Sequence, residues 1–207
     1  GPLADTLYED WYSGTLPYAV TARAGLAARL GPDTAVCHHT GADRIALRTA
    51  AGLIRASRHP DGGPVTLAPP GAAEQTADGP EHWFEVYDWG QSTVALRALA
   101  NGRHLGVADD GLLRNDRPGP SGWVVRETFR LVDRGTGDVA LFHVASDRYL
   151  RAAPDGTLRA DARNLPEATG FVVDVVGDGA AEAAALARDA DVAVVVLGNH
   201  PMVGGRE

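Results

Sequence analysis

Three stretches of the chain repeat one pattern of apolar and polar positions. In each, a short alternating run is followed by a small or polar turn and then by a second apolar run, which is typical of two antiparallel β-strands. The paired runs span residues 45–48 and 52–56, 94–97 and 102–106, and 139–142 and 147–151. Self-similarity at a nearly fixed spacing predicts a repeat architecture.

Each repeat opens on a leucine and closes on a phenylalanine. The leucines lie 49 and 45 residues apart, and the phenylalanines 45 and 42 apart. These residues are Leu47, Leu96 and Leu141, and Phe84, Phe129 and Phe171. One repeat of this length cannot bury its apolar face alone, so we expect the six side chains to share one core.

Turn signals separate the runs within the repeats. Asp-Gly occurs at 110–111 and 155–156, and each is soon followed by a leucine, Leu112 or Leu158. Asp-Gly beside alternating apolar residues is a strong hairpin signal. Three repeats of about four short strands predict a closed threefold β structure, and the architecture most similar to this is the β-trefoil. The runs VALRALANGRHLG, GLLR and ETFRLV resemble fascin-like trefoils, over residues 44–176.

The segments on either side have a different pattern. Residues 21–30 predict a helix capped by Thr21 and stopped at Gly31-Pro32, and residues 34–39 predict a strand. After the repeats, the alanine-rich residues 180–190 predict a second helix, and the near-continuous apolar run 191–198 predicts a parallel strand buried on both faces. Alternating helices and strands are typical of a doubly wound α/β layer.

The flanks also carry ordered motifs. GPLAD, DWYSG and PYAVT, within residues 1–21, resemble the opening of the C-terminal domain of family 3 glycoside hydrolases. GAD at 41–43 is similar to that family's Gly-Cys-Asp, with Ala42 in place of cysteine, and 190–198 resembles its Ala-Asp-Val strand ending in glycine. The resemblance implies a mainly β chain in which a three-repeat trefoil, 44–176, is inserted into a partial α/β domain formed by 1–43 and 177–207.

That resemblance also bears on catalysis. Retaining glycosidases need two carboxylates about 5 Å apart. In this family the nucleophile is an Asp on a barrel domain that these 207 residues do not include, and the family's acidic-Arg motif is not among them. We therefore expect no catalytic residue in this chain, and no hydrolysis by the chain alone.

Two loops are candidates for contact with substrate. Asn199, His200 and Glu207 follow the predicted buried strand, where ligands of open α/β sheets bind. This loop could instead be structural and pack against the missing barrel domain. Asp10, Trp11 and Tyr12 lie in the other loop, where aromatic rings could cover a sugar's apolar face, or form a hinge against the barrel domain.

Three tryptophans in the repeats are candidates for stacking on a glycan. Trp83 adjoins Phe84 and could instead belong to the core, whereas Trp89 and Trp123 lie in turn-rich segments. The Gln-x-Trp signature of ricin-type trefoils is absent, which weakens a direct lectin interpretation.

Charge and composition argue against some classes of binding partner. The formal net charge of −8, with scattered basic residues, argues against a nucleic acid. The longest apolar run, 192–197, is too short to span a bilayer, and no signal-peptide pattern opens the sequence.

Cys37 is the single cysteine and is expected to be a buried thiol. His38, His39 and His59 lack metal-ligand spacing, so we expect neither metal nor cofactor.

Two functions remain open. In the first, the chain is part of a family 3 β-glycosidase, and the trefoil recognises carbohydrate or shapes the cleft that admits an oligosaccharide. In the second, the chain is a non-catalytic module that binds carbohydrate or a protein. The flanking motifs favour the first function for the parent protein, and the absence of the barrel favours the second for this chain in isolation.

Overall fold

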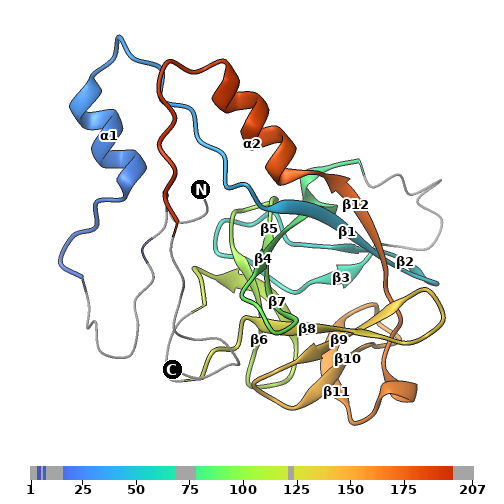
Figure 1. Ribbon diagram of the computed structural model, residues 1–207. Coiled ribbons are helices and arrows are strands. Elements are labelled where there is room, and N and C mark those ends of the chain that lie inside the picture. Colours follow the sequence, from blue (N-terminus) through green and yellow to red (C-terminus); the bar gives the residue numbers. More distant parts are fainter. Residues whose placement is uncertain (1–3, 6, 8–15, 69–77, 121–123, 198–207) are drawn as a thin grey trace.

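The computed structural model describes residues 4, 5, 7, 16–68, 78–120 and 124–197. Within them the fold is mainly β, with one α-helix before the strands and one after them (Figure 1). Neither helix is long and apolar enough to cross a membrane.

The strands fall into three groups of four that follow the sequence repeats. The first group is β1 (Asp43–Thr49), β2 (Gly52–Arg55), β3 (Thr66–Leu67) and β4 (Phe84–Asp88). The second is β5 (Thr93–Ala98), β6 (His104–Val107), β7 (Leu113–Arg117) and β8 (Thr128–Asp133). The third is β9 (Val139–His143), β10 (Arg148–Ala152), β11 (Leu158–Ala162) and β12 (Val172–Gly177). Short 3₁₀ turns, η1 (Pro80–His82) and η2 (Leu165–Glu167), precede β4 and β12.

The first and last strands of each group form a closed barrel. Antiparallel pairing runs from β12 to β1, β4, β5, β8 and β9 in turn. A bridge between Val139 and Phe171, with reciprocal backbone hydrogen bonds of 2.9 and 2.8 Å, completes the ring. Closure leaves no exposed sheet edge around the barrel.

The middle strands of each group form hairpins that cap one end of the barrel. Each hairpin is bridged to the other two, through Pro64 and Arg114, Thr66 and Thr157, and Leu112 and Arg159. Six barrel strands and three mutually bridged hairpins give a β-trefoil-like architecture, as the repeats predicted.

The predicted core is confirmed. The three phenylalanines and three leucines of the sequence pattern are each at most 1% exposed and lie in a single cluster. The predicted turns are confirmed as well. Gly111 and Gly156 have φ of 81° and 82°, and the preceding aspartates accept hydrogen bonds from the backbone of Leu112 and Thr157 at 2.9 and 3.0 Å.

Both predicted helices form. In α1 (Ala22–Leu30) the Thr21 hydroxyl accepts from Ala24 N at 3.1 Å, and the helix ends at Gly31, where φ is 79°. α2 (Gly179–Arg188) is capped by Asp178. No residue of α1 is buried, and its Leu26 and Leu30 are 37% and 49% exposed.

The two predicted flanking strands do not form in the described residues. Residues 34–39 are irregular, and 191–197 has no ladder partner, with Val192 78% and Leu197 75% exposed. A parallel strand needs neighbouring strands, and the described flanks supply none. The prediction that Cys37 is a buried thiol is also wrong: Cys37 lies within the unformed strand 34–39 and is exposed.

Candidate functional site at the trefoil junction

Seven of the nine candidate site residues lie outside the described part of the chain. They are Asp10, Trp11, Tyr12, Trp123, Asn199, His200 and Glu207. Their proposed contacts with substrate stay predictions. Trp89 is described: it is half-buried in the turn between β4 and β5, where its backbone N–H donates to Thr93 at 2.9 Å.

Trp83 is also half-buried, directly before the core residue Phe84. Its carbonyl accepts a hydrogen bond from the Leu99 N–H at 3.0 Å, which ties the end of the first repeat to the second. Trp83 and Trp89 therefore stand in different turns.

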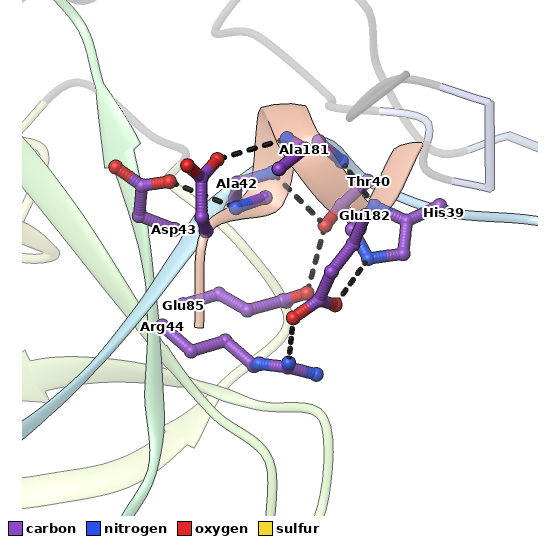
Figure 2. A network of polar contacts seen from close by, with 11 residues as sticks. His39, Thr40, Ala42, Asp43, Arg44, Glu85, Ala181 and Glu182 are labelled. Atoms are coloured by element: carbon purple, nitrogen blue, oxygen red, sulfur yellow. Dashed lines mark hydrogen bonds and ion pairs between the residues drawn. The ribbon is translucent and has the colours of Figure 1, made fainter. Parts of the chain in front are cut away.

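The structure instead gathers polar side chains where the chain enters and leaves the trefoil. The entering segment, 39–44, leads into β1, and the departing segment, 177–182, leads from β12 into α2; we call this place the junction (Figure 2). β1 and β12 are paired, with Arg44 opposite Gly177, so the two connections lie side by side.

Two aspartates hold the start of α2 at the junction. The Asp43 carboxylate accepts from Gly179 N at 2.9 Å, and the Asp178 carboxylate accepts from Ala181 N at 2.8 Å. Both satisfy N–H groups that a helix leaves unpaired in its first turn, and negative charge is favourable there. A Cβ at position 179 would lie 2.2 Å from the Ala42 carbonyl oxygen, so only glycine permits this close approach.

Glu182 of α2 binds two side chains of the entering segment. One carboxylate oxygen pairs with the Arg44 guanidinium, and the other lies 3.1 Å from His39 Nε2. Because the Gly41 N–H donates to His39 Nδ1 at 3.0 Å, the network assigns the ring proton to Nε2, which donates to Glu182 (Figure 2).

Glu85 anchors the same segment to the barrel. Its side chain is buried on β4, and it accepts hydrogen bonds from the Thr40 hydroxyl at 2.8 Å, Arg97 Nε at 2.6 Å and the Tyr87 hydroxyl at 3.3 Å. Arg97 lies opposite Glu85 on β5 and its guanidinium stands 5.6 Å from the Tyr87 ring centroid. A buried carboxylate needs such partners to offset its desolvation.

The polar contacts of the junction therefore hold the entering segment and α2 in place. Each of the two central carboxylates, Glu85 and Glu182, is held by an arginine and a further donor. Within the described residues, no group of three or more His, Cys, Asp or Glu side chains could hold a metal ion.

Two buried histidines lie elsewhere in the barrel. Burial lowers the pKa of His104 to about 4, with the nearby Arg97 charge adding to the shift, and burial also lowers the pKa of His143 to about 4. Their rings stand 5.4 Å from those of Tyr87 and Phe129 respectively. Both imidazoles are neutral at pH 7 and serve the packing of the barrel.

Sequence reasoning missed the junction network. Glu182 contacts residues 138 and 143 positions earlier, so no local pattern reveals it. Glu85 and Arg97 each interrupt a strand-like apolar run, which is a signal visible in the sequence. Predicting that they pair, however, requires the register of β4 against β5.

The fold defines a mainly β protein of β-trefoil-like architecture. No protein-family model matches the chain, and no curated protein matches it. Among solved structures, the chain is similar to a designed threefold-symmetric protein, ThreeFoil, at 16% identity with a TM-score of 0.53. The match covers 63% of this chain and 96% of that one. At this identity the likeness shows the fold alone, and it is the threefold fold that the repeats predicted.

Proposed function

We propose that this chain is part of a family 3 β-glycosidase, of the β-glucosidase-like kind, that hydrolyses β-linked glycosides. The trefoil is its accessory module, and it recognises carbohydrate or shapes access to the cleft. The catalytic nucleophile belongs to a barrel domain elsewhere in the polypeptide. The loops of Asp10–Tyr12 and Asn199–Glu207 border the sugar.

The junction is the observation that carries this proposal. A module tethered by a single flexible linker samples many orientations, whereas this trefoil has two adjacent connections, bonded to each other and to α2. A module in fixed orientation can form one wall of a cleft. Adjacent entry and exit strands are also what domain insertion requires.

The flanking segments support the same proposal. Leu26 and Leu30 of α1 and Leu186 of α2 are exposed, as are Val192, Val194, Val195 and Leu197 of the last described segment. Large apolar side chains that are exposed on several flanking elements are typical of surface that packs on further protein. A surrounding α/β domain, of which the flanks are two pieces, would cover it.

The assignment is tested by comparing the chain alone with the longer polypeptide that carries it. We expect the longer polypeptide to hydrolyse aryl β-glucosides and the 207-residue chain to leave them intact. Far-ultraviolet circular dichroism and a cooperative urea transition establish that the isolated chain is folded. Both proteins are assayed at equal molar concentration.

Either of two results contradicts the proposal. Turnover by the isolated chain that is lost on mutating one of its own carboxylates would place the active site here. A longer polypeptide without glycosidase activity would leave a non-catalytic binding module as the function.

A further inference from the structure

A depression opens on the surface between the first and third repeats. It has a volume of about 540 Å³ and is bounded by the β1–β2 turn, the β8–β9 turn and residues 169–172. Figure 1 shows those two turns next to each other at one side of the barrel. Sites for small ligands occupy roughly 300–1,000 Å³, so its size is suitable.

Two departures from threefold symmetry remove bulk at this place. The position before the closing phenylalanine is Trp83 in the first repeat and Thr128 in the second, but Gly170 in the third. The β1–β2 turn is also shorter than its counterparts, because Arg48 pairs with Leu53 whereas Arg97 pairs with His104 and Phe142 pairs with Tyr149.

The absence of a side chain at Gly170 leaves space for an ion pair that lines the depression. Arg134 Nη1 lies 2.7 Å from Asp138 Oδ2, and a Cβ at position 170 would stand 1.8 Å from that oxygen and 2.1 Å from that nitrogen. The Thr136 hydroxyl also donates to Asp138. That hydrogen bond, followed by those of the Arg134 guanidinium, lowers the pKa of Asp138, so the side chain is an ionised acceptor at pH 7.

The walls carry hydrogen-bonding groups without net charge. Arg48 on the opposite side is paired with Asp174, so the two arginines at the depression are balanced by two aspartates. A guanidinium has five donors and a carboxylate about four acceptor sites, and one mutual bond uses a small part of each. The remaining surface is made of small apolar groups, among them Ala50, Ala51 and Ala152.

This combination fits a neutral ligand with many hydroxyl groups. An anion would gain nothing from arginines already neutralised by aspartates, and an apolar ligand would leave the charged pairs desolvated. A sugar unit can bond its hydroxyls to Asp138 and Arg134 and lay its C–H surface on the alanines. We propose that the depression binds one unit of a neutral β-linked oligosaccharide, an inference that rests on the proposed carbohydrate-recognition role of the trefoil.

Amide chemical shifts of the ¹⁵N-labelled 207-residue chain test this site directly. The probes are cellotetraose and laminaritetraose, with sodium sulfate as the anionic probe. We expect at least one tetrasaccharide to shift the amides of Ala50, Gly137 and Gly170, and sulfate to leave them in place. Saturation of the shifts gives the Kd.

Two variants and one control localise the binding. Ala50→Leu on the exposed turn fills the depression, and Asp138→Asn removes the carboxylate with little change of shape. Each should weaken tetrasaccharide binding about tenfold or more, the scale of one good polar interaction. Ala145→Leu in the β9–β10 turn, the third-repeat counterpart of the β1–β2 turn, adds the same bulk elsewhere and should bind as the parent chain does.

The opposing results are specific. No shift with either tetrasaccharide, shifts that persist in Ala50→Leu, or shifts produced by sulfate instead would each overturn the site. Binding is measured without the barrel domain, so its failure leaves the glycosidase assignment standing. Conversely, binding by a chain whose longer polypeptide is inactive would retain the site and refute that assignment.

Discussion

At the scale of single residues, Glu85 fastens the entering segment to the barrel. It is buried, and three donors from three separate positions converge on it. Replacing Glu85 by alanine leaves Arg97 and the Thr40 hydroxyl without their acceptor. We expect Glu85→Ala to lower the free energy of unfolding by about 2–3 kcal/mol, measured by urea denaturation.

Asp161→Ala is the matched control, because it also removes an acidic partner of an arginine on a neighbouring strand. The Arg151–Asp161 pair is exposed, so its loss should cost at most about 0.5 kcal/mol. Equal losses of unfolding free energy in the two variants would show that the burial of Glu85 does not make its interactions more stabilising.

The two buried histidines make stability depend on pH. Their folded-state pKa is about 4 and their unfolded value about 6.5, so below pH 6.5 the unfolded chain binds more protons and stability falls. The loss grows as the pH falls from 6.5 to 4. We expect about 2 kcal/mol from each histidine between pH 7 and pH 5.

Urea denaturation at half-unit pH steps measures this slope. His143→Gln should flatten it by about half, whatever its effect on stability at pH 7. A parent chain whose stability is unchanged between pH 7 and pH 5 would show that these imidazoles are not buried as neutral groups.

At the scale of elements, the hairpin turns depend on glycine. Gly111 and Gly156 adopt the left-handed conformation, and an added Cβ would find its nearest neighbours at 3.7 Å and 4.0 Å. Space is therefore available and the cost is conformational. Gly111→Ala and Gly156→Ala should each destabilise the chain by about 1 kcal/mol.

Gly25→Ala provides the contrast. Gly25 lies inside α1, where alanine is the better helix former and its Cβ would meet Val20 at an ordinary 3.6 Å. Thermal unfolding should show no loss for Gly25→Ala. A similar loss at all three positions would contradict the turn geometry.

Local signals predicted the elements where structure depends on neighbours in sequence. Alternation located the strands, Asp-Gly located two hairpins, and Thr21 marked the start of α1. The strands predicted at 34–39 and 191–198 failed because a strand also needs a partner that the described residues lack. The glycan contacts predicted for Trp89 and Trp123 stay predictions, because Trp123 lies outside the described residues and no bound glycan tests Trp89.

At the scale of the whole molecule, the repeat spacing predicted a closed threefold core, because similar repeats can bury their apolar faces against one another. It could not predict the junction or the depression. The junction joins residues more than 130 positions apart, and the depression arises where the repeats differ, at Gly170 and at the shortened β1–β2 turn. Features that break symmetry are visible only once the repeats are placed against one another.

We propose that a fixed trefoil governs which substrates reach a glycosidase cleft. The most direct measurement deletes residues 44–176 from the complete polypeptide and joins Asp43 to Gly177 with a short Gly/Ser linker, which the pairing of β1 and β12 allows. Steady-state kinetics then compare an aryl β-glucoside with β-linked tetrasaccharides. We expect a raised KM for tetrasaccharides, with kcat and the kinetics of the aryl glucoside nearly unchanged, because distal sugar units contribute largely uniform binding. A folded deletion variant that treats both substrate classes as the complete enzyme does would contradict it.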